Sequence, residues 1–324
     1  MQTDSFVAVV SITQWTPRFY DASRNFRQNH QLSTWEFVCN LPKLALKKME
    51  SYSIILIKRE RKEERSVSMS KAIITVAGKG GVGKTSISAA IVRQLVKAHP
   101  EDRILAIDAD PAVGLATALG VEVGITVDDI RKAITQAGQE ERDKRRAKAM
   151  LGEVKFRLFD AMVETNGFAF IAVGRPEAAG CYCGINAYLK EVISMMSEEF
   201  DYVVIDGEAG IEQVNRRVME KVSHMLLVSD PSKKGITVIK TIKKVADELV
   251  MYEKIGVIIN RLGEESQKQY IDTGDLPILA YIPEDKALQL ADIKGESVLN
   301  LPDDSLLVSG VQQALEKIGI LRKL

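Results

Sequence analysis

The chain has 324 residues, of which 46% are hydrophobic and 27% charged, with 44 Lys and Arg against 44 Asp and Glu. These apolar side chains suffice for a sizeable core, which excludes a fibrous or disordered chain. A net charge of zero gives no electrostatic reason to expect nucleic acid or an anionic membrane as a partner. The apolar stretches are too short to span a bilayer, and three cysteines cannot form a disulfide scaffold. We therefore expect a soluble protein from a reducing compartment.

Residues 1–68 differ from the rest of the chain. They contain both tryptophans and 11 Lys and Arg against 7 Asp and Glu, so their net charge is positive while that of the remainder is negative. We expect an N-terminal extension over residues 1–68 and one functional domain over residues 69–324. The extension is an added module, a targeting peptide, or sequence upstream of a true start at Met69. The last is favoured, because purine-rich codons resembling a ribosome-binding site can encode the Arg61–Arg65 run, and acidic residues argue against a transit peptide.

From residue 71 the chain alternates between two patterns. Apolar runs rich in Ile and Val predict buried strands over Lys71–Ala77, Arg103–Ile107, Phe168–Val173, Tyr202–Ile205, Met225–Val228, Ile255–Ile259 and Ile278–Tyr281. Helical periodicity predicts helices over Ser86–Ala98, Ile185–Met196, Ile211–Lys221, Gly235–Tyr252 and Val308–Ile318. Continuous apolar strands that alternate with helices predict a doubly wound α/β fold, with a mostly parallel sheet flanked by helices.

A phosphate-binding loop follows the first predicted strand. The segment Gly78-Lys-Gly-Gly-Val-Gly-Lys-Thr85 fits the pattern G-x-x-x-x-G-K-[ST], between a strand and an amphipathic helix. Its glycines let backbone N–H groups curl around phosphate oxygens, and the helix N-terminus adds positive charge. Lys84 is expected beside the β- and γ-phosphates, with the Thr85 hydroxyl on Mg²⁺. The expected nucleotide-binding residues here are Gly78, Gly80, Gly81, Val82, Gly83, Lys84, Thr85 and Ser86.

The plain pattern does not require Lys79, which follows the first glycine directly. With this lysine the loop resembles that of the deviant Walker A ATPases, the group that includes MinD, ParA and the nitrogenase iron protein. That resemblance implies a nucleotide-sandwiched dimer in which Lys79 of each copy reaches the phosphates of the other. The alternative is an exposed loop lysine without such a role.

Carboxylates end two further strands, where open α/β sheets place their ligand chemistry. Asp108-Ala-Asp110-Pro resembles the switch I segment of the same ATPases, which implies that Asp110 orients the attacking water and that Asp108 supports the magnesium shell. The alternative is that both carboxylates cap the next helix. Asp206 ends a buried strand, as expected of a Walker B magnesium ligand, and Gly207–Gly210 would then be switch II.

Asn260-Arg261 follows another predicted strand and resembles the adenine-contacting pair of that group. An amide can donate and accept toward a purine edge at once. A simple turn residue after a strand is the rival interpretation for Asn260.

Two cysteines share one glycine-flanked segment, Gly180-Cys181-Tyr-Cys183-Gly184. A disulfide between residues i and i+2 would be strained, whereas two thiolates can face one soft metal. A symmetric dimer supplies four sulfurs, which suit Zn²⁺ or iron–sulfur in a tetrahedron and Ni²⁺ in a square plane. The alternative is that Cys181 and Cys183 only fill space in the interior.

Four segments together resemble those of the CooC family, the nickel-insertion accessory ATPases of carbon monoxide dehydrogenase. They are Gly78–Thr85, Gly174-Arg-Pro-Glu177, Cys181-x-Cys183 and Asp206-x-Glu-Ala-Gly-Ile-Glu212. The resemblance runs from Lys71 to near the C-terminus. It implies a cytoplasmic homodimer that hydrolyses ATP with Mg²⁺, binds Ni²⁺ through both cysteine pairs and serves carbon monoxide dehydrogenase, or acetyl-CoA synthase, as client. Two rival functions stand: a positioning ATPase like MinD or ParA, and an iron–sulfur reductase like the nitrogenase iron protein.

Overall fold

The computed structural model describes residues 72–110, 112–130, 132, 159–174, 199–207 and 221–322. The chain divides into two units, Met1–Ser68 and Met69–Leu324, and every described residue belongs to the second. The predictions for residues 1–68 and for the helix over 185–196 lie outside the described residues, as does nearly all of the helix predicted over 211–221.

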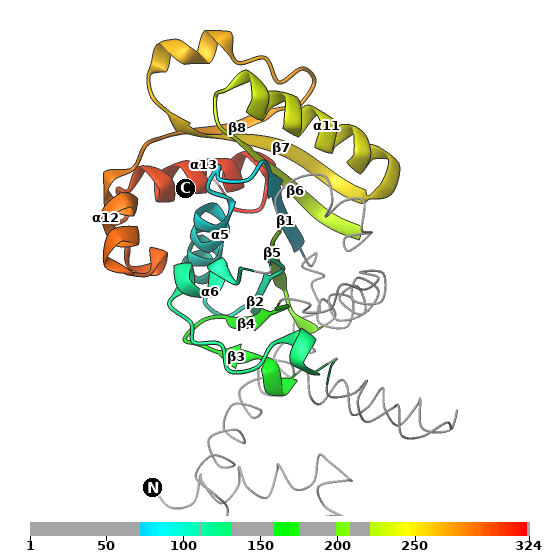
Figure 1. The fold of residues 1–324 in the computed structure, drawn as a ribbon, viewed down its shortest axis with the longest axis vertical. Coiled ribbons are helices and arrows are strands. Elements are labelled where there is room, and N and C mark those ends of the chain that lie inside the picture. The colour runs from blue at the N-terminus through cyan, green and yellow to red at the C-terminus, as the bar shows by residue number, and fades with distance from the viewer. Residues whose placement is uncertain are drawn as a thin grey trace, which may run out of the picture. The chain divides into compact units, whose positions relative to one another are not determined.

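A twisted eight-stranded sheet forms the centre of the described part of the chain (Figure 1). Neighbouring strands are parallel, except for the antiparallel pair at one edge, β3 and β4. This confirms the prediction of a mostly parallel sheet. In spatial order the strands are β3 (Val163–Glu164), β4 (Ala169–Ala172), β2 (Ile104–Asp108), β5 (Tyr202–Asp206), β1 (Ala72–Gly78), β6 (Lys221–Ser229), β7 (Met251–Leu262) and β8 (Ile278–Pro283).

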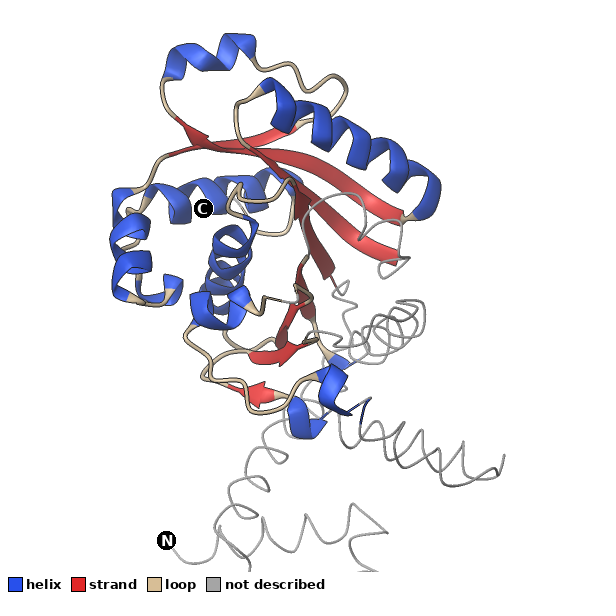
Figure 2. Cartoon of the chain, in the orientation of Figure 1, coloured by secondary structure: helices blue, strands red, loops and turns tan. Residues whose placement is uncertain are grey.

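Helices cover the sheet on both faces, which explains why its strands are apolar throughout (Figure 2). One face packs against α5 (Lys84–Ala98) and α13 (Leu306–Ile318), and the other against α11 (Lys233–Leu249). Alternate residues of β1 enter the two cores, since Ile74 and Val76 belong to the first and Ala77 to the second. The remaining described helices are α6 (Gly114–Leu119), η1 (Glu265–Tyr270), α12 (Lys286–Lys294) and η2 (Val298–Asn300).

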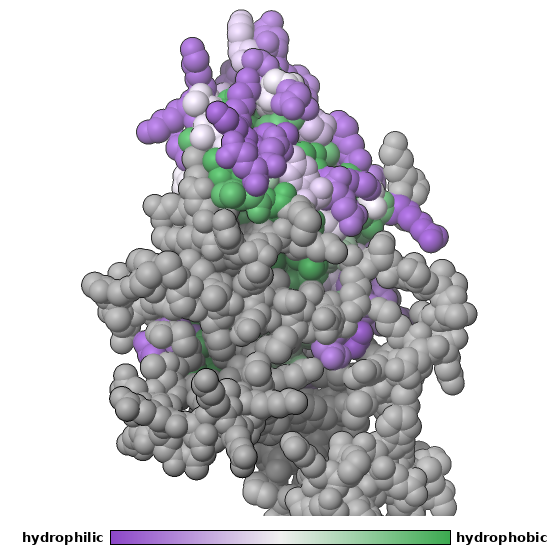
Figure 3. All heavy atoms as spheres, turned by 90° about the vertical axis from the view of Figure 1, so that its right-hand side faces the viewer, coloured by the Kyte–Doolittle hydropathy of each residue, from purple (hydrophilic) through white to green (hydrophobic). Residues whose placement is uncertain are grey.

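The amphipathic sequence of α11 determines how it packs. Its buried positions include Ile236, Ile239 and Ile242, which recur at the spacing of one helical face. Ser232 begins the helix by accepting the N–H of Gly235 on its hydroxyl, at 3.0 Å. Where described residues face the viewer in Figure 3, hydrophilic side chains predominate, with smaller hydrophobic areas between them.

Two predicted C-terminal ends of helices were wrong, and the strands predicted over Met225–Val228 and Ile255–Ile259 are longer, as β6 and β7. The helix predicted over Gly235–Tyr252 ends at Leu249, because Met251 and Tyr252 pair with the first residues of β6 and belong to β7. Lys221, predicted as the end of a helix, is the first residue of β6. In both places sheet pairing overrides the helical periodicity. Among the described helices, none combines the length and hydropathy that a membrane crossing requires.

Candidate functional site

Polar or loop-forming residues stand at the carboxyl ends of five adjacent strands. In spatial order they are Asp108 at the end of β2, Asp206 at the end of β5, Gly78 at the end of β1, Asp230 after β6 and Asn260 near the end of β7. Ligands of open α/β sheets bind at this edge. The topology therefore gathers one site from residues that lie up to about 180 positions apart.

The phosphate loop has the predicted context, since it joins the buried strand β1 to α5. Gly78 has φ 156°, and a Cβ there would lie 2.1 Å from the carbonyl oxygen of Val228, so the loop leaves the sheet pressed against β6. Gly81 and Gly83 have φ values of 80° and 91°, in the left-handed region that favours glycine. These glycines give the segment its tight curl.

The two lysines of the loop have different partners. Lys84, buried at the first position of α5, donates from Nζ to the carbonyl oxygen of Lys79 at 3.3 Å. Lys79 itself forms an ion pair with Asp230, with 3.2 Å between Nζ and Oδ2. The backbone N–H of Ser232 donates to Oδ1 of Asp230 at 3.1 Å. Burial raises the pKa of Asp230, but the hydrogen bonds from Ser232 and Lys79 outweigh it and hold that pKa below its usual value. Lys79 is therefore held within its own chain in this structure.

Asp206 is the buried centre of the site. Its Oδ2 accepts a hydrogen bond from the Thr85 hydroxyl at 2.8 Å, and its Oδ1 accepts one from the Ser88 hydroxyl at 2.9 Å. Burial raises the pKa of Asp206 against the opposing effect of these hydrogen bonds and of the Lys84 charge. The predicted Walker B carboxylate thus lies in contact with the predicted magnesium hydroxyl.

Asp108 lies beside Asp206 in the register of β2 and β5. Its oxygens accept the backbone N–H groups of Asp110 and Leu115, at 3.1 and 2.8 Å, so it connects the segment predicted to be switch I to the start of α6. Burial and then the Asp206 charge raise its pKa to about 7, although these hydrogen bonds oppose the shift. Asp110 instead accepts the N–H of Ala112 at 2.9 Å, in a local turn. The helix-capping alternative therefore describes Asp108 and not Asp110.

The donors around Asp206 fit a magnesium ion. Thr85 and Asp206 offer the hydroxyl and carboxylate oxygens that Mg²⁺ prefers. Negative charges crowd this carboxylate, because the Asp110 charge raises the pKa of Asp206 and the Asp206 charge raises the pKa of Asp108. A divalent cation relieves such repulsion. Thr85 and Asp206 are thus the residues that would hold it.

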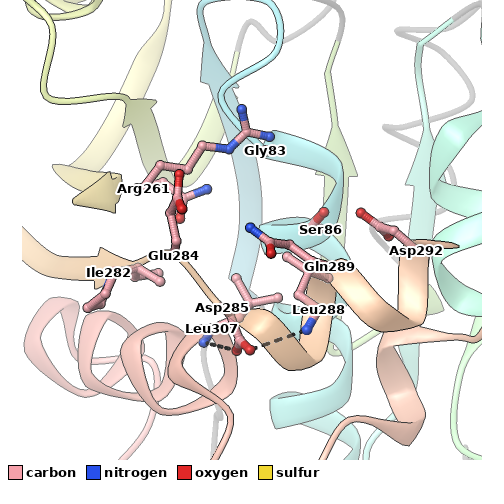
Figure 4. Close-up of a pocket in the computed structure, with 12 residues that line it drawn as sticks. Gly83, Ser86, Arg261, Ile282, Glu284, Asp285, Leu288, Gln289, Asp292 and Leu307 are labelled. Atoms are coloured by element: carbon pink, nitrogen blue, oxygen red, sulfur yellow. Dashed lines mark hydrogen bonds between the residues drawn. The ribbon is translucent and has the colours of Figure 1, made fainter. Parts of the chain in front are cut away.

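A cavity of about 230 Å³ opens beside the phosphate loop. Asn260 lines it and is 5% exposed, and its Nδ2 donates to the carbonyl oxygen of Val82 at 2.8 Å. Arg261, with φ 58°, occupies a β-bulge of β7 against β8. In Figure 4 the Arg261 side chain extends toward the loop at Gly83, and Glu284 lies close to it. The predicted base-contacting pair therefore stands at a cavity next to the phosphate loop, although Asn260 lies within β7 rather than after it.

Cys181 and Cys183 lie outside the described residues. The strand that precedes them in the sequence, β4, ends at Ala172 and lies next to β2 in the sheet. Within the described ranges, no group of three or more His, Cys, Asp and Glu residues has the arrangement of a metal site.

Sequence reasoning missed three polar residues of this edge. Asp230 follows β6 directly, and the rule that polar residues after buried strands reach the ligand edge could have found it. Ser88 is one turn beyond Thr85 on α5, so helical spacing brings both to Asp206. Asp285 accepts N–H groups from the starts of both α12 and α13, a link between distant segments that leaves no local signal.

Comparisons with known proteins agree with this geometry. The sequence profile of the CobQ/CobB/MinD/ParA nucleotide binding domain matches residues 73–298. An uncharacterized ATP-binding protein of Methanocaldococcus jannaschii is 37% identical over 251 residues, which cover 76% of this chain and 98% of that protein. The carbon monoxide dehydrogenase accessory protein CooC of Rhodospirillum rubrum is 29% identical over 70% of this chain and 89% of its own length.

The fold also has relatives among solved structures. The septum site-determining protein MinD of Pyrococcus horikoshii, solved with Mg-ADP, superposes with a TM-score of 0.57. It is 21% identical, and the match covers 79% of this chain and all of that one. The phosphate loop, the carboxylates at the strand ends and the profile that spans the domain together show that this chain belongs to the CobQ/CobB/MinD/ParA family of P-loop, ATP-binding proteins.

Proposed function

We propose that this protein is an ATP-hydrolysing metallochaperone. In this proposal two copies dimerise around nucleotide, bind one Ni²⁺ as cargo through Cys181 and Cys183 of each copy, and help to insert it into carbon monoxide dehydrogenase. The observation that carries the proposal is the Cys-x-Cys segment itself, because nucleotide binding alone does not account for two thiols in one glycine-flanked loop. The similarity to CooC, a carbon monoxide dehydrogenase accessory protein, supports the same client.

The topology offers a physical link between nucleotide and metal. The cysteine segment begins after β4, and only β2 and β5 separate that strand from β1 and the phosphate loop. Asp108 and Asp206 end those two intervening strands, so both carboxylates stand between β4 and the phosphate loop in the order of the sheet. By linkage, a metal that prefers one dimer state must favour the nucleotide bound in that state.

The residues of the edge have separate roles in hydrolysis. Lys84 would bind the β- and γ-phosphates, and Asp110 would orient the attacking water. Lys79 would leave Asp230 and reach the phosphates of the partner copy. Thr85 and Asp206 would hold Mg²⁺, which would neutralise part of the phosphate charge. Loss of the γ-phosphate would then release the segment after Asp206 and loosen the thiolate site toward the client.

The test is metal analysis of an anaerobically purified double variant, Cys181→Ser with Cys183→Ser. We expect it to lose stoichiometric Ni²⁺ while it keeps ATP hydrolysis, since no described part of the nucleotide site contains a cysteine. Cys39→Ser is the matched control, because it removes the third cysteine of the chain and should leave Ni²⁺ binding unchanged. Unaltered Ni²⁺ binding in the double variant refutes the metal site.

A positioning ATPase is the second candidate, and the similarity of the fold to MinD favours it. In that case ATP would control attachment to a membrane or to DNA. Co-sedimentation with liposomes and with DNA, with and without ATP, separates the candidates. ATP-dependent co-sedimentation together with an absence of bound Ni²⁺ would favour this second function.

A further inference from the structure

The side-chain amide of Asn260 is already engaged by the phosphate loop. Its Nδ2 donates to the carbonyl oxygen of Val82 at 2.8 Å, in a buried hydrogen bond between residues 178 positions apart. A side chain that only contacted a base would not require this hydrogen bond to the phosphate loop. Because a buried amide–carbonyl pair is costly to separate, this contact fixes the distance between the end of β7 and the loop.

Gly83 is the steric counterpart of this bond. Its φ is 91°, and a Cβ at this position would lie 2.5 Å from Nδ2 of Asn260. Real Cβ atoms do not approach a nitrogen so closely, so the loop lies against Asn260 at a distance that only glycine permits. Gly83 is also the N-cap residue of α5, directly before Lys84. The contact with Asn260 therefore acts where the loop becomes the helix that carries Lys84 and Thr85.

Asn260 also belongs to the wall of the 230 Å³ cavity. Arg261, the next residue, lines the same cavity but has φ 58° and occupies the bulge of β7. Successive residues of a regular strand point to opposite faces, and the bulge alters this alternation so that both neighbours reach the cavity wall. Asn260 thus lines the cavity and also forms a hydrogen bond with the phosphate loop.

We propose that Asn260 is a positioning residue that couples occupancy of the cavity to the shape of the phosphate loop. A loop carbonyl that turned toward a phosphate would repel its oxygens. Asn260 holds the Val82 carbonyl on the β7 side of the loop, which leaves the N–H groups that follow available to phosphate. A nucleoside in the cavity immobilises Asn260 and so stabilises the phosphate-binding loop. This inference rests on the nucleotide-binding part of the proposed function and needs neither nickel nor a second copy.

The test separates the two halves of the nucleotide. Affinity for Mg²⁺-pyrophosphate is measured on the full chain by calorimetry, alone and with saturating adenosine, for the wild type, Asn260→Leu and the control Asn300→Leu, which makes the same change at an exposed position outside the cavity wall. Leucine is similar in size to asparagine but cannot donate to Val82. We expect Asn260→Leu to bind pyrophosphate about tenfold more weakly, the effect of one lost buried hydrogen bond to a loop that must be ordered. Asn300→Leu should bind pyrophosphate within twofold of the wild type.

Coupling between the two ligands is the second readout, because a purely structural role of Asn260 would not change it. Saturating adenosine should tighten pyrophosphate binding severalfold in the wild type and in Asn300→Leu, and not in Asn260→Leu. If Asn260→Leu does not fold, as judged by circular dichroism, Asn260→Ser replaces it. Either wild-type affinity for pyrophosphate in the position 260 variant, or no coupling in the wild type, overturns the proposal. Both results are independent of Ni²⁺ binding, so a failure here is distinct from a failure of metal delivery.

Discussion

The ion pair between Lys79 and Asp230 predicts how a single substitution should change dimerisation. If Lys79 must reach the phosphates of a second copy, its contact with Asp230 in the same chain competes with the dimer. Asp230→Asn removes the negative charge and keeps an oxygen that can accept the N–H of Ser232, now bonded at 3.1 Å. The start of α11 should therefore be preserved while Lys79 is released.

The magnitude follows from the exposure of the pair. The side chains of Lys79 and Asp230 are 31% and 26% exposed, and their charged atoms lie 3.2 Å apart. An ion pair of this partly solvated kind contributes about 0.5–1 kcal/mol. Formation of the wild-type dimer breaks two such pairs, one in each copy, whereas the Asp230→Asn dimer has none to break. Dimerisation of the variant should therefore be more favourable by about 1–2 kcal/mol. This corresponds to an ATP-dependent dimer roughly 5–30-fold tighter in Asp230→Asn.

Sedimentation equilibrium with a non-hydrolysable ATP analogue measures this change. Asp303→Asn is the matched control, because Asp303 also pairs with a lysine, Lys97 at 2.7 Å, but does so away from the phosphate loop. The control should dimerise like the wild type. An Asp230→Asn dimer as weak as the wild-type dimer, or weaker, would refute the competition between the two contacts.

Two further predictions concern stability. Burial and then the Lys254 charge lower the pKa of His224 to about 4, so the folded state resists a proton that the unfolded chain binds below pH 6.5. The free energy of unfolding of the wild type should therefore fall relative to that of His224→Gln by up to about 3 kcal/mol as the pH drops from 6.5 to 4. Urea unfolding of both proteins measures this difference, and a difference that stays constant over the pH range would contradict the prediction. Gly83→Ala should destabilise the nucleotide-free protein more than Gly81→Ala, because both positions have positive φ but only at Gly83 would the new Cβ meet another atom, at 2.5 Å. The left-handed backbone costs each variant about 1–2 kcal/mol of stability. If urea unfolding shows the same loss of stability in both variants, the Asn260 side chain moves aside without an energetic cost and the prediction is wrong.

The strands and the main site motifs could be predicted from the sequence because their signals are local. Buried parallel strands are continuous apolar runs, and β2 and β5 are buried at every position. The phosphate loop has its pattern within eight residues, flanked by a strand and a helix. Asp206 was predictable because a carboxylate that ends a buried strand lies at the ligand edge of the sheet.

The rest depended on contacts between distant segments. No local pattern shows that Lys79 pairs with Asp230, 151 positions away, or that Asn260 donates to Val82. Both ends of β7 were predicted wrongly for a related reason. Pairing with β6 extends the strand over Met251 and Tyr252, and pairing with β8 extends it to Leu262. The short helix α6 begins at Gly114 with little helical periodicity, and its start is stabilised by Asp108.

The central claim is that two chains share one metal ion under the control of nucleotide. Nickel and protein are best measured on the same anaerobic fraction, after size exclusion in the presence of ATP and Mg²⁺. The proposed dimer predicts one Ni²⁺ for every two chains, eluting only with the dimer. One Ni²⁺ for each chain, carried equally by the monomer, would contradict the shared site.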